Sequence, residues 1–120
     1  MNPLVVVLGA SPNPDRFSYK AVRRLARGQY RIVAIGKRQG MIENIPIVTG
    51  RPVLSDVHTV LIYLAPSHQG EIFDYVISLK PRRVVFNPGT ESPEFAEFLE
   101  SCNISVVNEC SLVMMATGSF

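Results

Sequence analysis

The stretch Leu4-Val5-Val6-Val7-Leu8-Gly9-Ala10-Ser11 decides the fold of this chain. Its unbroken apolar run is typical of a parallel strand covered on both faces, because polar residues alternate with apolar ones only where one face meets water. The run ends at a glycine and small residues, and an amphipathic segment follows. A helix that starts after such a turn presents unpaired N–H groups and the positive end of its dipole, which bind anions. The sequence therefore predicts a buried first strand that leads into a site for a phosphorylated ligand.

Further apolar runs and helical patterns alternate along the chain. Apolar runs predict strands at residues 30–35, 60–64, 84–86 and 104–107, and the breakers between Gly40 and Asp56 favour a loop or a short extra strand at 45–48. Helical spacing predicts helices at 17–26, 67–79, 92–99 and 109–116.

This alternation predicts the α/β class. Strands and helices joined by right-handed crossovers give a Rossmann-like, doubly wound, mostly parallel sheet with helices on both faces. At 120 residues we expect a single domain, residues 1–120. Ligands bind such sheets beyond the carboxyl ends of the strands, where strand order reverses. Site residues are therefore expected in the segments 9–18, 36–38, 65–67 and 87–90.

Composition excludes several classes of protein. The net charge of +2 is small and the basic residues are scattered, which argues against a nucleic-acid surface. No apolar stretch approaches the roughly 18 residues of a membrane span, and only Met1-Asn2-Pro3 precedes the first run, so we expect a cytoplasmic protein. Cys102 and Cys110 fit neither a zinc pattern nor a disulfide framework.

The loop after the first strand departs from the dinucleotide-binding pattern GxGxxG. The later glycines of that pattern are replaced within Ser11-Pro12-Asn13-Pro14-Asp15-Arg16. The prolines stiffen the loop, and its polar side chains, with Ser18, offer donors to an anion near the start of the helix. Capping and turn formation explain the same residues in an isolated loop. Their position after a buried first strand favours the anion site.

The turn after the second strand is basic. NAD-binding folds place an Asp or Glu there to accept from the ribose hydroxyls, whereas this chain has Gly36-Lys37-Arg38. A cation at this position favours a ribose that carries a further phosphate, as in NADP or coenzyme A. A solvated basic turn explains it equally well.

Taken together, these motifs resemble the stand-alone CoA-binding domain proteins, which are similar to the N-terminal domain of the succinyl-CoA synthetase α subunit. The resemblance covers nearly the whole chain and is carried by Leu8-Gly9-Ala10-Ser11-Pro12-Asn13-Pro14, Ser18-Tyr19, the basic turn, Leu54-Ser55-Asp56-Val57, Ala65-Pro66, Asn87-Pro88-Gly89-Thr90 and Asn108-Glu109-Cys110. It implies that the chain binds coenzyme A or an acyl-CoA. The chain departs at Ile35-Gly36-Lys37, where relatives often have Asn-Pro-Lys.

The resemblance also implies a role for each site residue. The phosphate loop comprises Gly9 and Ala10, and the diphosphate is held by Ser11, Asn13, Arg16 and Ser18. Lys37 meets the 3′-phosphate or lies beside the adenosine. The pantetheine arm is flanked by Ala65 and Pro66, and the opposite wall runs from Asn87 to Gly89.

The sequence offers little evidence of catalysis. His58 is expected just ahead of the third strand, on the surface and away from the ligand edge, whereas His68 lies on the ligand edge, as a ligand contact or as a polar helix start. No acid or serine forms an evident triad with either histidine. We therefore expect no catalytic residue and no metal site, in a regulatory or accessory CoA-binding protein. The alternatives are an NADP-dependent reductase, a detached acyl-CoA synthetase fragment, or an interaction module whose cleft binds no nucleotide.

Three further residue positions carry minor hypotheses. Cys110 follows the last strand. Under oxidising conditions its thiol would form a mixed disulfide with the thiol of coenzyme A, and the alternative is that Cys110 is simply a buried small residue. Cys102 is expected to pack in the interior, and Met114-Met115 in the core or at a dimer contact.

Neither nucleic acid nor membrane is expected as a partner, and a homodimer or another protein partner stays open.

Overall fold

The first strand, β1 (Leu4–Leu8), lies at the centre of the sheet with all of its residues buried. The computed structural model describes residues 2–120. Seven strands form one sheet in the order β3-β4-β2-β1-β5-β6-β7, and all neighbours are parallel except the antiparallel pair β3 and β4. The other strands are β2 (Arg31–Ile35), β3 (Gly40–Ile42), β4 (Ile45–Val48), β5 (Val57–Ile62), β6 (Arg83–Phe86) and β7 (Ser105–Asn108).

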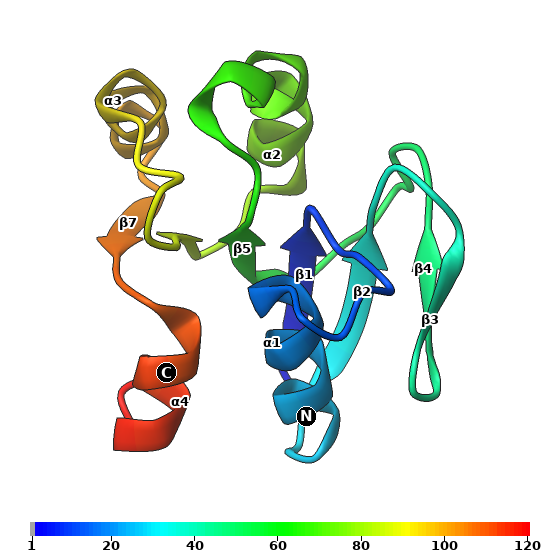
Figure 1. Cartoon of the computed structure of the whole chain (residues 1–120). Coiled ribbons are helices and arrows are strands. Elements are labelled where there is room, and N and C mark those ends of the chain that lie inside the picture. Colours follow the sequence, from blue (N-terminus) through cyan, green and yellow to red (C-terminus); the bar gives the residue numbers. More distant parts are fainter. Residues whose placement is uncertain (1) are drawn as a thin grey trace.

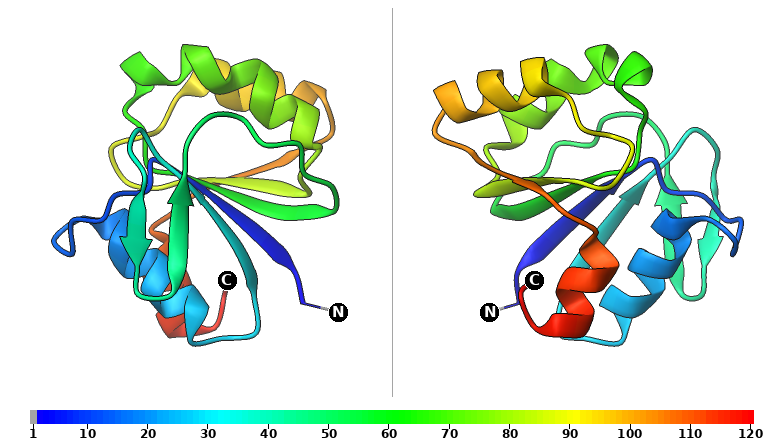
Figure 2. Two further views of the ribbon diagram at one scale, coloured as in Figure 1. Left: turned by 90° about the vertical axis from the view of Figure 1, so that its right-hand side faces the viewer. Right: turned by 60° about the vertical axis from the view of Figure 1, so that its left-hand side comes forward.

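Helices cover both faces of the sheet (Figures 1 and 2). On one face lie α2 (Phe73–Leu79) and α3 (Pro93–Ser101), and on the other lie α1 (Phe17–Ala26) and α4 (Ser111–Thr117). Each face has its own apolar cluster: Val6, Val60 and Phe95 belong to the first, and Val5, Val22 and Met114 to the second. The predicted Rossmann-like α/β fold is therefore confirmed.

The strand order has its switch point between β1 and β5. From β1 the chain proceeds outward to β2 and β4, whereas from β5 it proceeds in the opposite direction to β6 and β7. The connections therefore leave a crevice beyond the carboxyl ends of β1 and β5, which is the place where such sheets bind ligands.

Local sequence explains how α3 begins. The side chain of Ser92 accepts a hydrogen bond from the Phe95 N–H at 3.3 Å, Pro93 occupies the first turn, and Glu94 places a carboxylate near the positive end of the helix dipole. This start was predicted from the Ser-Pro-Glu sequence alone.

Two of the expected elements differ from those in the structure. β5 runs from Val57 to Ile62 instead of 60–64, which places His58 inside the strand, though still at the end away from the ligand edge. The helix expected at 67–79 is divided into the 3-10 turns Pro66–His68 and Gly70–Ile72 followed by α2, because the fully buried Gln69 side chain bonds to neighbouring loops at this point.

The segment between Gly40 and Val48 is a hairpin. The short strand expected at 45–48 is present as β4, but its antiparallel partner β3 was not anticipated. The turn between them has Glu43 at φ 53°, a left-handed conformation that sequence patterns do not reveal for a glutamate.

The minor packing hypotheses have mixed outcomes. Met114 is buried in the core, which is one of the two positions expected for the Met114-Met115 pair. The interior position expected for Cys102 is wrong, because this residue caps the C-terminal end of α3 and is exposed. Cys110 is half-buried at the start of α4. Within residues 2–120, no helix combines the length and the apolar character that a membrane span needs.

Candidate functional site

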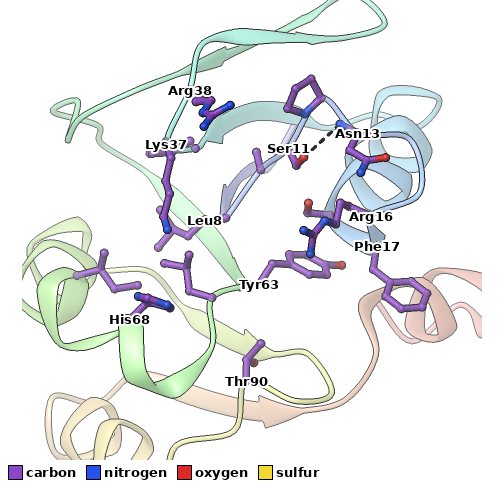
Figure 3. Close-up of a pocket in the computed structure, with 18 of the residues that line it drawn as sticks. Leu8, Ser11, Asn13, Arg16, Phe17, Lys37, Arg38, Tyr63, His68 and Thr90 are labelled. Atoms are coloured by element: carbon purple, nitrogen blue, oxygen red, sulfur yellow. Dashed lines mark hydrogen bonds between the residues drawn. The ribbon is translucent and has the colours of Figure 1, made fainter.

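A cleft of about 950 Å³ lies beyond the carboxyl ends of β1, β2 and β5 (Figure 3). This volume is near the upper end of the roughly 300–1,000 Å³ typical of small-molecule sites. Its walls come from the loop after β1, the start of α1, the turn after β2 and the segments that follow β5 and β6. The lining residues are Leu8, Gly9, Ala10, Ser11, Pro12, Asn13, Arg16, Phe17, Ser18, Ile35, Gly36, Lys37, Arg38, Tyr63, Leu64, His68, Glu71, Ile72, Pro88 and Thr90.

Two glycines allow the loop after β1 to pack closely against its neighbours. Gly9 has φ 93°, and a Cβ there would lie 3.0 Å from the backbone carbon of Tyr63. A Cβ on Gly36 would lie 2.3 Å from the carbonyl oxygen of Ala10, inside van der Waals contact. The glycines therefore fix how near the loop lies to β2 and β5.

The loop side chains form local hydrogen bonds and keep donors free. The Asn13 N–H donates to Ser11 Oγ at 3.1 Å (Figure 3). The Asp15 N–H donates to Asn13 Oδ1 at 3.0 Å. Ser11 thus uses its oxygen as an acceptor and keeps its O–H hydrogen, and Asn13 keeps its side-chain NH₂ group. Both residues can donate to an anion in the cleft.

The start of α1 is an uncapped helix terminus that faces the cleft. The residue before the helix, Arg16, makes no side-chain capping bond, and the first turn contains no acid. Within residues 2–120, the N–H groups of Phe17, Ser18 and Tyr19 have no hydrogen-bond acceptor. Free N–H groups and the positive end of a ten-residue helix form a natural anion site.

The charge of the cleft is mostly positive. Arg16, Lys37 and Arg38 line it and are exposed, whereas Glu71 is the one carboxylate among the lining residues of the described chain. Lys37 and Arg38 follow β2, so they lie across the cleft from the start of α1 (Figure 3). A ligand with phosphate groups at both places would be attracted along its length.

The far wall of the cleft, formed by the loops after β5 and β6, is held in place by buried amide side chains. Asn87 Nδ2 donates to the Ile62 carbonyl at 3.0 Å, and Asn87 Oδ1 accepts from the Ser111 N–H at 2.8 Å and from Ser111 Oγ at 2.5 Å. Gln69 Nε2 donates to the carbonyls of Leu64 at 2.8 Å and Thr90 at 2.6 Å. These bonds join the loops after β5 and β6 to each other and to α4.

Tyr63, directly after β5, also lines the cleft. Its hydroxyl is buried and has no hydrogen-bond partner of ordinary geometry within residues 2–120. Burial raises the pKa of Tyr63 to about 12, an effect that the nearby Ser111 hydroxyl partly offsets and the Cys110 thiol slightly reinforces. The phenol is therefore a neutral O–H donor at physiological pH.

The predicted site residues fall into two groups. Gly9, Ala10, Ser11, Asn13, Arg16, Ser18 and Lys37 line the cleft together. Ala65 and Pro66 are exposed beside it, Gly89 is exposed next to the lining residue Pro88, and Asn87 is buried behind the wall. Contact of these four residues with a ligand stays a prediction.

Several lining residues were missed from the sequence. Tyr63 was assigned to the interior of a strand that in fact ends at Ile62, so it was not considered as an edge residue. Thr90 lies in the segment 87–90, where site residues were expected because it follows β6, but Thr90 itself was not chosen as a site residue. Phe17 was assigned to the apolar face of α1, yet it is 65% exposed and lines the mouth of the cleft.

Comparison with known proteins agrees with this geometry. Residues 4–116 match the family model described as "CoA binding domain". The chain belongs to this CoA-binding domain family. The resemblance noted from the sequence is thus confirmed at the level of the family. No curated protein has a sequence that matches this chain.

Solved structures share the fold of this CoA-binding domain. A crystal structure of an uncharacterized protein has a TM-score of 0.96 and 38% identity, over 100% of this chain and 99% of that one. The structure of cell-free ID.343 from Thermus thermophilus has a TM-score of 0.81 and 24% identity, over 99% of this chain and 91% of that one. Prb, a protein redesigned for binding, has a TM-score of 0.85 at 16% identity, over 99% of this chain and 86% of that one, and this likeness concerns the fold alone.

Proposed function

We propose that the protein binds coenzyme A or an acyl-CoA in this cleft without catalysing a reaction, as a regulatory or accessory subunit. The observation that carries the proposal is the start of α1, where three backbone N–H groups without acceptors face a cleft lined by Arg16. Such a terminus suits the diphosphate of coenzyme A, which needs several donors and positive charge at once. The family match supports coenzyme A as the source of that diphosphate.

The rest of the cleft fits the remaining parts of coenzyme A. Its volume of about 950 Å³ accommodates a long, folded ligand. Lys37 and Arg38 would hold the 3′-phosphate, since no other cations line that side of the cleft within residues 2–120. Leu64, Ile72 and Pro88 give the far wall apolar surface for the pantetheine arm, at the place where the resemblance puts Ala65 and Asn87.

The titratable groups of the cleft support a binding role rather than catalysis. General acid–base catalysis is most efficient when the acting group has a pKa near the working pH, which enzymes set by burial and neighbouring groups. Within residues 2–120, no side-chain hydrogen bond joins His68, Glu71 or Tyr63 to a second titratable group. The raised pKa of Tyr63, about 12, also makes its phenolate a rare species at neutral pH.

Calorimetric titration tests the proposal. Wild-type protein is titrated with CoA, dephospho-CoA and NADPH, and the proposal predicts binding of CoA that is tighter than that of dephospho-CoA. Tight NADPH binding with weaker CoA binding would favour a reductase instead. No binding of any of the three would leave the chain as an interaction module.

A charge reversal at Lys37 sharpens this test. Lys37→Glu should weaken CoA by about 1 to 3 kcal/mol more than it weakens dephospho-CoA, the range of a charge-assisted contact. Arg82→Glu makes the same change of charge at an exposed position at the opposite edge of the sheet and should affect the two ligands equally. Equal losses for both ligands in Lys37→Glu would mean that Lys37 does not meet the 3′-phosphate.

A further inference from the structure

Two buried side-chain polar atoms of the described chain have no hydrogen-bond partner, the Tyr63 hydroxyl and Gln69 Oε1. The Gln69 side chain is fixed by its two bonds to loop carbonyls, and Gln69 is not among the residues that line the cleft. Tyr63 is among them. Because a buried donor without an acceptor destabilises the folded state, an unpartnered hydroxyl at a ligand cleft needs an explanation.

Backbone contacts fix Tyr63 beside the loop after β1. It is the first residue past β5, and its N–H donates to the carbonyl of Leu8 at 2.9 Å. Its backbone and Cβ would be within 3.0 to 3.2 Å of any Cβ on Gly9, so this side chain and the loop after β1 form one packed unit. In Figure 3 the hydroxyl end of Tyr63 is turned toward the side of the cleft where Arg16 and Phe17 begin α1.

Within residues 2–120, this hydroxyl has no acceptor in hydrogen-bonding geometry. Ser111 lies close enough to lower the pKa of Tyr63, but its own hydroxyl donates to Asn87 Oδ1 at 2.5 Å and does not meet the Tyr63 hydroxyl in hydrogen-bonding geometry. The raised pKa keeps the phenol protonated, so the hydroxyl remains a donor across the physiological pH range. The start of α1, with its free N–H groups and Arg16, also presents donors to the cleft. An oxygen of a ligand bound there can accept from these groups.

We infer that the Tyr63 hydroxyl donates a hydrogen bond to a diphosphate oxygen of the bound ligand, which makes Tyr63 a further ligand-binding residue of the cleft. This inference rests on the proposed function, because it takes the diphosphate of that ligand to lie at the start of α1. A phosphate oxygen is favoured over a carbonyl of the pantetheine arm because the hydroxyl is directed to the side of the cleft where Arg16 and Phe17 begin α1 (Figure 3).

The variant Tyr63→Phe tests the inference with two ligands, CoA and ADP, in calorimetric titrations. ADP contains a diphosphate and lacks the pantetheine arm, so it isolates the phosphate contact. Tyr63→Phe should weaken both ligands by a similar factor of about 10, which corresponds to about 1.4 kcal/mol. The matched control Tyr30→Phe removes a hydroxyl from a half-buried tyrosine just before β2 that does not line the cleft, and it should leave both affinities unchanged.

The thermal midpoint of the ligand-free protein provides the second measurement. Because Tyr63→Phe removes a donor that has no acceptor, its midpoint should equal or exceed that of wild type. A clear fall would show that the hydroxyl bonds within the protein, with Ser111 as the acceptor, and would overturn the inference.

The binding outcomes separate this inference from the proposed function. Unchanged affinity of Tyr63→Phe for both ligands overturns the inference and leaves CoA binding intact. Weakening of CoA alone assigns the contact to the pantetheine arm or the 3′-phosphate, both of which ADP lacks, and also overturns the contact with the diphosphate. If wild type binds ADP but not CoA, the proposed function fails, yet weakening of ADP by Tyr63→Phe still supports the phosphate contact.

Discussion

Replacing Asn87 by alanine should destabilise the protein strongly, although Asn87 was expected from the sequence to contact the ligand. The side chain is 3% exposed and makes three hydrogen bonds, one to the Ile62 carbonyl and two from Ser111. At about 1 kcal/mol for each lost bond, and up to about 2 more for the buried Ser111 N–H left without an acceptor, the loss is roughly 3 to 5 kcal/mol. At about 4 °C per kcal/mol, the thermal midpoint falls by roughly 12 to 20 °C.

Urea denaturation followed by circular dichroism measures this loss directly. Asn108→Ala, at an exposed asparagine near the end of β7, is the matched control and should change stability by no more than about 0.5 kcal/mol. Asn87→Asp keeps the shape of the side chain but puts an oxygen opposite the Ile62 carbonyl, so it should also destabilise the protein. This second variant provides the test if the alanine variant does not fold. A loss below about 1 kcal/mol in both variants would refute the structural role of Asn87.

Three further predictions concern residues around the cleft. Gly36→Ala puts a methyl group 2.3 Å from the Ala10 carbonyl oxygen, so the phosphate loop must shift, and CoA affinity measured by calorimetry should fall by at least about 10-fold, or about 1.4 kcal/mol. Gln69→Glu replaces the donor to two carbonyls with a buried carboxylate, so its stability deficit in urea should shrink as pH falls from 7 to 5 and the carboxyl becomes protonated, whereas a pH-independent deficit would contradict this. Because the pKa of Tyr63 is about 12 in the folded state and about 10 when unfolded, folding stability should decline as pH rises above 10, and Tyr63→Phe should remove a part of that decline on the order of 2 to 3 kcal/mol.

The centre of the fold was predictable because its signals are local. The continuous apolar run from Leu4 to Leu8 can be buried on both faces only inside a parallel sheet, and the Ser92-Pro93-Glu94 start specifies a helix by itself. Once strand and helix alternation is established, handedness and the switch point locate the ligand edge. The cleft was therefore found in the expected place, beyond β1 and β5.

The features that the sequence did not reveal depend on contacts between distant segments. β5 ends at Ile62 because its pairing with β1 ends at Leu8, and this register places Tyr63 at the cleft. Asn87 is in a segment expected to contact the ligand, but its bonding to Ser111 is a contact across 24 positions of sequence that no local pattern encodes. The hairpin partner β3 is three residues long and half-exposed, too short for a periodic signal.

Amide chemical shifts of ¹⁵N-labelled protein during addition of CoA test the central claim most directly, because they report on the backbone N–H groups themselves. The account predicts the largest changes in the loop from Gly9 and at the first three residues of α1, Phe17, Ser18 and Tyr19, with smaller changes at Lys37 and Tyr63. No change on addition of excess CoA, or changes confined to the amino edge of the sheet, would contradict it.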